Sequence, residues 1–194
     1  MIRHHTPIRA IFIGTSAGGV TALNEIFRSL PENFSIPIIA VLHLGESAFI
    51  PNAFYAPKGV VLREADEKEP ILAKHIYFAP AGYHLLIEED FTLSLSTEEK
   101  VQYARPSLDV TMDTMARAYE DSVLGIVLTG ANEDGAQGLT TIKEYRGLTL
   151  VQNPEEAEYP TMPMAALKKA KPDFILSVKE IGPFLAKLEG AINE

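Results

Sequence analysis

The chain has no cysteine and no tryptophan among its 194 residues, and its acidic side chains outnumber its basic ones. Without cysteine there is no disulfide framework, no thiolate zinc site and no cysteine nucleophile. The 17 basic and 26 acidic side chains leave a formal net charge of −9, which disfavours nonspecific attraction to phosphate backbones or anionic lipid. We therefore expect a protein of a reducing compartment, by default the cytoplasm, with no nucleic-acid partner.

Segments that would cross or target a membrane are also missing from the sequence. The longest apolar stretch, at 36–42, is interrupted by Pro37 and is far shorter than the ~20 residues that a bilayer-spanning helix needs. Residues 1–7, which include the adjacent His4 and His5, have no apolar central region of the kind found in secretory signals. We interpret 1–7 as a short solvated leader, and we expect no membrane insertion, no metal site and no organic cofactor.

The sequence does contain an alternation of strand-like and helix-like segments. With 46% hydrophobic residues the chain can bury a proper core, and apolar β-branched runs followed by helical spacing predict a parallel sheet covered by helices. Three short strands at 75–79, 83–87 and 91–95 are predicted to form an antiparallel hairpin appended to that sheet. The strands predicted for the sheet lie at 8–13, 36–42, 60–62, 123–128, 148–151 and 174–176. Five helices are predicted: one near 23–30, one from 107 onward, one that follows the loop at 129–135 and ends at about 145, one after 163 and one at 181–188.

No repeat, low-complexity tract or long linker divides the chain. We therefore expect a single domain over 1–194 with its core at about 8–188. The expected fold class is α/β, with a doubly wound, mostly parallel sheet in a Rossmann-like three-layer arrangement and the appended antiparallel hairpin.

A glycine-rich turn after the first predicted strand carries the pattern of a nucleophilic serine. Residues 14–19 read Gly-Thr-Ser-Ala-Gly-Gly, which contains Gly-x-Ser-x-Gly between a strand and a helix. A sharp strand-to-helix turn needs residues without a Cβ beside the serine, and it exposes the serine oxygen near helix amides that stabilise an oxyanion. The same turn is also compatible with a phosphate-binding loop, or with a tight turn in which Ser16 caps the helix.

A serine hydroxyl becomes a good nucleophile only beside a base, and the base needs an acid that orients it. His43 directly follows the second predicted strand, and Asp134 lies in the loop that follows a later strand. Because residues just past the carboxyl ends of parallel strands converge on one crevice, we expect Ser16, His43 and Asp134 to form a catalytic triad. Asp134 is preferred over Glu133 because the shorter side chain is held better in a tight turn. Taken singly, His43 is also compatible with a packed or surface histidine, and Asp134 with a helix N-cap.

Five motifs extend these loops: Ile13-Gly-Thr-Ser-Ala-Gly-Gly19, Val41-Leu-His-Leu44, Phe78-Ala-Pro-Ala-Gly-Tyr-His84, Arg105-Pro-Ser-Leu-Asp109 and Leu128-Thr-Gly-Ala-Asn-Glu-Asp-Gly-Ala136. In these motifs and their order the chain resembles the catalytic domain of the chemotaxis protein-glutamate methylesterases, over about residues 8–188. The resemblance implies a doubly wound α/β fold and hydrolysis of methyl esters on glutamates of methylated chemoreceptor cytoplasmic helices, with deamidation of receptor glutamines as a side activity. It also implies that Ser16, His43 and Asp134 occupy the triad positions.

The chain departs from the family pattern in the loops that would hold an oxyanion. Ala17 stands where family members commonly carry threonine, and Gly130-Ala-Asn-Glu-Asp-Gly135 replaces their Gly-Met-Gly-x-Asp-Gly. The loops of Ala17 and Ala131 remain the candidate oxyanion hole, and Arg105 is the candidate contact to an acidic receptor helix, with a surface ion pair as its alternative. The receiver domain that usually precedes this domain is not in the sequence, so we expect a free-standing esterase or one regulated by a separate receiver or kinase protein.

Three other functions stay open from the sequence alone. A catalytically weak module that docks on a receptor or kinase would keep the fold, and Ala17 and Ala131 favour it. A patatin-like esterase would pair the serine turn with the Asp-Gly-Ala at 134–136, although its upstream glycine-rich oxyanion loop is missing. A nucleotide-binding protein is disfavoured because no lysine follows the glycine loop, and the α/β-hydrolase fold is disfavoured because the chain order here is serine, histidine, acid.

Overall fold

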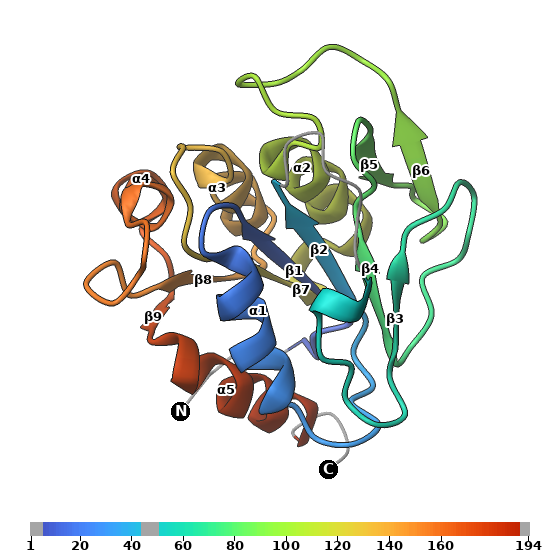
Figure 1. Ribbon diagram of the computed structural model, residues 1–194. Coiled ribbons are helices and arrows are strands. Elements are labelled where there is room, and N and C mark those ends of the chain that lie inside the picture. Colours follow the sequence, from blue (N-terminus) through green and yellow to red (C-terminus); the bar gives the residue numbers. More distant parts are fainter. Residues whose placement is uncertain (1–5, 44–50, 191–194) are drawn as a thin grey trace.

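The computed structural model describes residues 6–43 and 51–190, so His4, His5 and most of the expected leader lie outside the described residues. Seven parallel strands form one sheet in the order β3-β4-β2-β1-β7-β8-β9 (Figure 1). This is the doubly wound α/β sheet that the sequence predicts. The strands are β1 (Ala10–Thr15), β2 (Ile38–Leu42), β3 (Val61–Glu64), β4 (His75–Phe78), β7 (Val123–Val127), β8 (Leu148–Gln152) and β9 (Phe174–Leu176).

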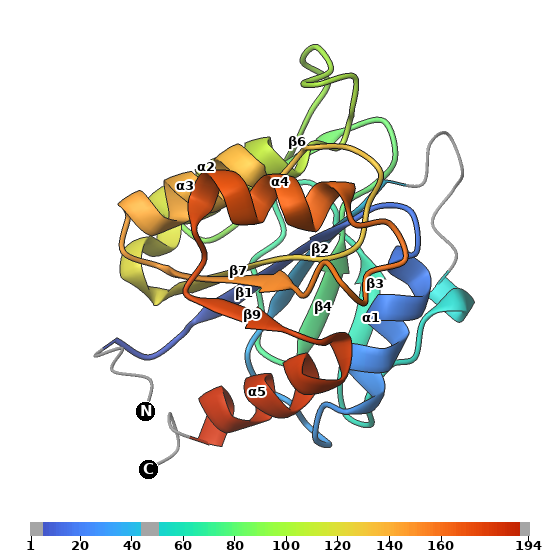
Figure 2. The same cartoon turned by 90° about the vertical axis from the view of Figure 1, so that its left-hand side faces the viewer.

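Helices cover both faces of the sheet, which gives the three expected layers (Figure 2). One face packs against α1 (Gly19–Arg28) and α5 (Val178–Gly190), whose apolar side chains join those of β1, β2 and β4 in one core cluster. The other face packs against α2 (Leu108–Tyr119), α3 (Ala136–Glu144) and α4 (Thr161–Ala170) in a second cluster. Two short 3-10 helices, η1 (Pro51–Ala53) and η2 (Glu120–Ser122), are also present.

The predicted three-strand hairpin segment is wrong in one respect. Only β5 (His84–Ile87) and β6 (Leu93–Ser96) form a separate antiparallel pair, whereas the strand predicted at 75–79 is β4 and lies in the parallel sheet between β2 and β3. Residues 76–78 are buried almost completely. A strand that is apolar on both faces belongs inside a parallel sheet covered by helices, and an exposed hairpin would leave one of these faces in water.

Several element boundaries also differ from the predicted ones. The first strand runs from Ala10 to Thr15, two residues later than predicted. Helix α4 begins before Pro163, at Thr161, because a proline in the first turn removes no helical hydrogen bond. Helix α5 begins at Val178 and continues through Pro183 to Gly190.

The order of the strands creates a switch point between β1 and β7. From β1 the chain proceeds to β2 and β4 on one side, and it later returns to β7, β8 and β9 on the other side. The loops that leave the carboxyl ends of β1 and β7 therefore run in opposite directions and open a crevice, which is where open α/β sheets bind ligands. No helix within 6–43 and 51–190 is long and apolar enough to cross a membrane.

Candidate active site

Ser16 lies in the tight turn between β1 and α1, at the switch point of the sheet. Gly18, with a φ of 79°, is the N-cap of α1 in the left-handed conformation that favours glycine. At Gly14 an added Cβ would lie 2.3 Å from Leu108 Cδ2, because the start of α2 packs closely against the end of β1. The glycines on either side of Ser16 are thus required by backbone conformation and by packing, as the sequence pattern predicts.

Thr129, at the end of β7, anchors the Ser16 turn. Its carbonyl oxygen accepts the Ser16 N–H at 3.1 Å and the Thr15 hydroxyl at 2.7 Å. Its own hydroxyl donates to the Ala17 carbonyl at 3.0 Å. These contacts join two turns that lie 114 residues apart in the chain, and a threonine just past a strand end was the only sequence feature that pointed to them.

His43 leaves the carboxyl end of β2 beside this turn. The β1–β2 register pairs Thr15 with Leu42, and the His43 N–H donates to the Thr15 carbonyl at 3.1 Å. Ser16 and His43 are therefore the first residues past the ends of two adjacent strands. Among the described residues the Ser16 hydroxyl has no hydrogen-bond partner.

Asp134 lies within reach of His43, with its Oδ2 atom 3.1 Å from His43 Nε2, and its side chain is 1% exposed. The carboxylate also accepts the backbone N–H groups of Leu108 at 2.7 Å and Asp109 at 3.0 Å, and the Ser107 hydroxyl at 3.0 Å. Asp134 therefore caps the N-terminus of α2, while Gly135 holds the N-cap position of its own helix α3. Burial is the strongest influence on the pKa of Asp134 and would raise it, but the contact with His43 and the two amides lower the pKa below its ordinary value.

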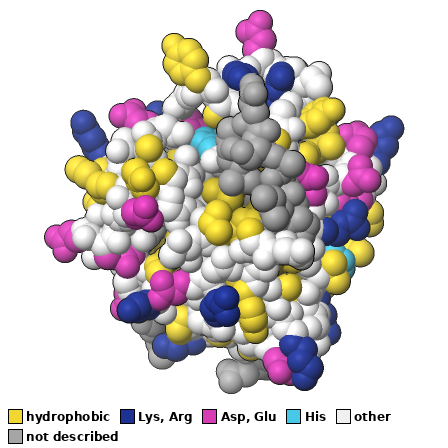
Figure 3. Space-filling model, in the orientation of Figure 1, with side chains coloured by type: hydrophobic (Ala, Val, Ile, Leu, Met, Phe, Trp, Pro, Cys, Tyr) yellow, Lys and Arg dark blue, Asp and Glu magenta, His cyan; other side chains and the backbone are white. Residues whose placement is uncertain are grey.

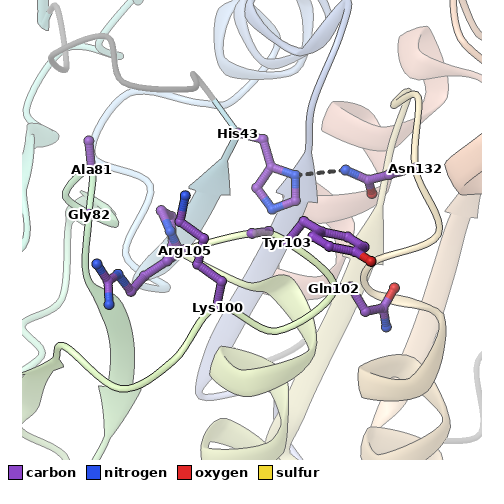
Figure 4. Close-up of a pocket in the computed structure, with 10 residues that line it drawn as sticks. His43, Ala81, Gly82, Lys100, Gln102, Tyr103, Arg105 and Asn132 are labelled. Atoms are coloured by element: carbon purple, nitrogen blue, oxygen red, sulfur yellow. Dashed lines mark hydrogen bonds between the residues drawn. The ribbon is translucent and has the colours of Figure 1, made fainter.

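Asn132 fixes the tautomer of His43 (Figure 4). Its Oδ1 accepts the Asp134 backbone N–H at 3.0 Å, so the atom that faces His43 Nδ1, also at 3.0 Å, is the amide nitrogen. An amide nitrogen only donates, so Nδ1 carries a lone pair and the proton of neutral His43 is on Nε2, next to Asp134. Asn132 was not among the site residues expected from the sequence, although an asparagine at a position where the family pattern has glycine was an available signal.

Asp109, in the first turn of α2, makes the reciprocal contact. Its Oδ1 accepts the N–H groups of Gly135 at 2.9 Å and Gly138 at 2.7 Å at the start of α3. Asp134 thus caps α2, and Asp109 caps α3. The two caps together hold the Asp134 loop against α2. Burial and, to a smaller extent, the negative charge of Asp134 raise the pKa of Asp109, and the amides of Gly138 and Gly135 only partly offset this rise. No sequence pattern pointed to this role of Asp109.

Arg105 lies across a cavity of about 690 Å³ from His43 (Figure 4). Its Nη1 donates to the carbonyl oxygens of Thr97 at 2.7 Å and Glu98 at 2.8 Å, so within 6–43 and 51–190 the guanidinium is held by backbone acceptors and not by the acidic partner of a surface ion pair. Residues that line the cavity include His43, Lys100, Gln102, Tyr103, Arg105 and Asn132.

The remaining candidates fall into two groups. Ala17 directly precedes the N-terminus of α1 and is half-buried, and Ala131 is exposed in the loop before Asn132, so the two lie on the turns that flank the switch point. His84 is buried, with Nδ1 accepting the Ser107 N–H at 3.3 Å and Nε2 2.9 Å from the Glu99 carbonyl. Within 6–43 and 51–190 no three histidine, aspartate or glutamate side chains are grouped as metal ligands.

Comparison with known proteins identifies the family. The family model described as CheB methylesterase matches residues 11–185, which includes all three strand-end loops described above. The chain belongs to the CheB methylesterase family. A crystal structure of the CheB methylesterase catalytic domain of Thermotoga maritima superposes with a TM-score of 0.86 and 27% sequence identity, covering 94% of this chain and all of that one.

Curated CheB relatives carry the same activity in their names. A Leptospira interrogans protein, named a candidate protein-glutamate methylesterase/protein-glutamine glutaminase, is 44% identical over 182 residues, which cover 93% of this chain and 94% of that protein. The Archaeoglobus fulgidus protein-glutamate methylesterase/protein-glutamine glutaminase is 32% identical over 95% of this chain, which spans about half, 54%, of its length. These CheB matches favour the methylesterase interpretation over the patatin-like and nucleotide-binding alternatives.

Proposed function

We propose that the chain is a protein-glutamate methylesterase in which Ser16 is the nucleophile, His43 the general base and Asp134 the acid that orients His43. The observation that carries this assignment is the His43–Asp134 contact beside the Ser16 turn, in a chain of the CheB methylesterase family. The substrates proposed are glutamyl methyl esters on the cytoplasmic helices of methylated chemoreceptors. Hydrolysis of receptor glutamine amides is the proposed side activity, and the cytoplasm is the proposed location.

In the first half of the reaction, the Ser16 oxygen attacks the ester carbonyl while Nδ1 of His43 takes the hydroxyl proton. Because Asn132 keeps the proton of the neutral ring on Nε2, Nδ1 is the nitrogen with a free electron pair, and the Ser16 hydroxyl replaces the Asn132 amide there. Asp134 stabilises the imidazolium that forms, since its carboxylate is buried and its pKa is lowered.

The tetrahedral intermediate then collapses with loss of methanol, which takes its proton from His43. The backbone N–H groups of Ala17, in the turn just before the N-cap of α1, and of Ala131 are the proposed donors to the oxyanion, because both residues lie on turns beside the crevice at the switch point. Water repeats the sequence on the acyl-enzyme and releases glutamate and free Ser16. Arg105 is proposed to bind acidic groups of the receptor next to the ester, and a separate receiver or kinase protein is proposed as the regulator.

Methanol release from receptor cytoplasmic fragments that have been methylated in advance tests this function. The parent protein should release methanol, whereas Ser16→Ala should release at least about 10³-fold less, because no other group replaces the nucleophile. Unfolding midpoints of the two proteins should agree, since the Ser16 hydroxyl makes no hydrogen bond to another described residue. Only a few-fold loss of activity would reject Ser16 as the nucleophile. Tight binding of fragments without hydrolysis by the parent would instead support a catalytically weak binding module.

A further inference from the structure

The loop between β6 and α2 carries the most exposed large apolar side chain among the described residues. Tyr103 is 98% exposed, far more than Leu72 at 48% or Tyr83 at 40%. Figure 3 shows a hydrophobic side chain that projects from the top of the molecule, over this loop. A tyrosine that contacts almost nothing in its own chain contributes little to folding stability, so its role has to be sought outside the fold.

The loop that holds Tyr103 is nevertheless well anchored. Val101 and Ala104 exchange backbone hydrogen bonds of 3.1 and 2.9 Å directly across the tip. At one end of the loop Arg105 donates to the backbone carbonyls of Thr97 and Glu98, and within the tip the Gln102 amide donates to Asp109 Oδ2 at 3.0 Å. The tip is therefore tied to the same aspartate that caps α3.

The backbone of the tip is also strained. Gln102 and Tyr103 have φ angles of 48° and 64°, in the left-handed region where glycine or asparagine costs less. Strained backbone positions cluster at active sites, ligand clamps and switch regions. A tyrosine on an anchored backbone offers a large contact area and has only two side-chain torsions to fix on binding, which makes it an efficient anchor for a protein partner.

The position and charge of this loop indicate which partner it fits. Tyr103, Lys100 and Arg105 line the cavity that also contains His43 and Asn132 (Figure 4). None of the described residues that line this cavity is acidic, although the whole chain has a net charge of −9. A positive rim on a negative protein is complementary to carboxylates, and ester hydrolysis at His43 itself produces a carboxylate.

We propose that Tyr103, with Lys100 beside it, forms a docking surface for the protein segment that carries the glutamyl ester. This inference rests on the proposed function and names how its substrate is selected: Tyr103 packs against apolar side chains of the segment, and Lys100 faces carboxylates next to the reacting glutamate. The loop therefore distinguishes an ester presented on a folded, acidic protein surface from the same ester on a small molecule.

Kinetics with two substrates test the docking surface. One substrate is a methylated receptor cytoplasmic fragment, and the other is a capped single glutamate γ-methyl ester, which carries none of the neighbouring side chains that would pack against Tyr103 or face Lys100. In Tyr103→Ala the ratio of kcat/KM for the fragment to kcat/KM for the small ester should fall about tenfold, mainly through a higher KM for the fragment. Leu72→Ala is the matched control: it removes an exposed apolar side chain that precedes the amino end of β4, whereas the site lies past the carboxyl ends of the strands, and it should leave the ratio unchanged.

A binding measurement separates failure of the docking surface from failure of the proposed function. In a Ser16→Ala background, Tyr103→Ala should weaken binding of the methylated fragment about tenfold, and Lys100→Gln should reduce the dependence of that binding on salt. If the parent hydrolyses neither substrate, the proposed activity is wrong, but the binding measurement in the Ser16→Ala background still shows whether Tyr103 contributes to a docking surface. Equal affinity and an equal kcat/KM ratio with and without Tyr103 would overturn the inference, as would an equal effect of Leu72→Ala.

Discussion

Replacing Asp134 with asparagine removes a charge that two backbone amides, a hydroxyl and an imidazole share. The change keeps the size of the side chain but turns one oxygen into a donor. If the new NH₂ stands at Oδ2 it opposes the Leu108 N–H and His43 Nε2, and if it stands at Oδ1 it opposes the Asp109 N–H. Either orientation leaves one buried backbone N–H of α2 without an acceptor.

The expected cost follows from these contacts. A buried amide that loses its acceptor costs about 1–3 kcal/mol, and loss of negative charge at a helix N-terminus adds about 0.3–1 kcal/mol. We therefore expect Asp134→Asn to lower the free energy of unfolding by about 3 kcal/mol, which for a chain of this size lowers Tm by about 6–12 °C. Urea and thermal unfolding at pH 7 measure both quantities.

Asp109→Asn is the matched control, because it makes the same chemical change in the reciprocal cap. Both glycine amides donate to one oxygen, Oδ1, which asparagine keeps, and the Gln102 amide can turn to accept at the other position. The substitution also removes the repulsion from Asp134 that helps to raise the pKa of Asp109. We expect a change in the free energy of unfolding within about 1 kcal/mol. An Asp134→Asn protein as stable as the parent, or equal losses in both variants, would refute the reasoning.

Three further predictions concern the same region. Because folding lowers the pKa of Asp134, the ionised carboxylate contributes to stability above its ordinary pKa of 3.8, and this contribution is lost as the pH falls through the folded-state pKa. The difference in free energy of unfolding between the parent and Asp134→Asn should therefore become smaller in acid. A difference that stays constant from pH 7 to about 2 would contradict this assignment. Gly14→Ala should cost about 1–3 kcal/mol in urea unfolding, since its Cβ would lie 2.3 Å from Leu108 Cδ2, and an unchanged midpoint would show that α2 moves away freely. Asn132→Ala should lower kcat about threefold to tenfold with a smaller effect on KM, because the tautomer of His43 is no longer held; steady-state methanol release measures this, and unchanged kcat would remove Asn132 from the site.

Much of the site could be predicted because strand ends in a parallel sheet converge. Once the strand before Gly14 and the strand before His43 are recognised, parallel pairing brings Ser16 and His43 together whatever the details of packing, and the β1–β2 register has this geometry. Glycine spacing was similarly informative, since Gly14 and Gly18 meet local requirements of packing and backbone conformation that only a tight turn imposes.

What the sequence could not supply are contacts whose partners are chosen by packing. The strand at 75–79 reads like its hairpin neighbours, and only burial between β2 and β3 assigns it to the parallel sheet. The pattern around Asp134 suggests a cap for its own helix, but the approach of α2 makes it the cap of another helix 26 residues earlier.

The sequence by itself therefore determined the α/β class, the glycine turn and the three loops that carry Ser16, His43 and Asp134, because hydrophobic periodicity and glycine requirements are local properties of the chain. The tertiary structure alone decided the proton position on His43, through an Asn132 contact that spans 89 residues, and the exposure of Tyr103 on an anchored tip. Hydrogen bonds and burial between distant segments depend on how the layers pack, and no local pattern records that packing.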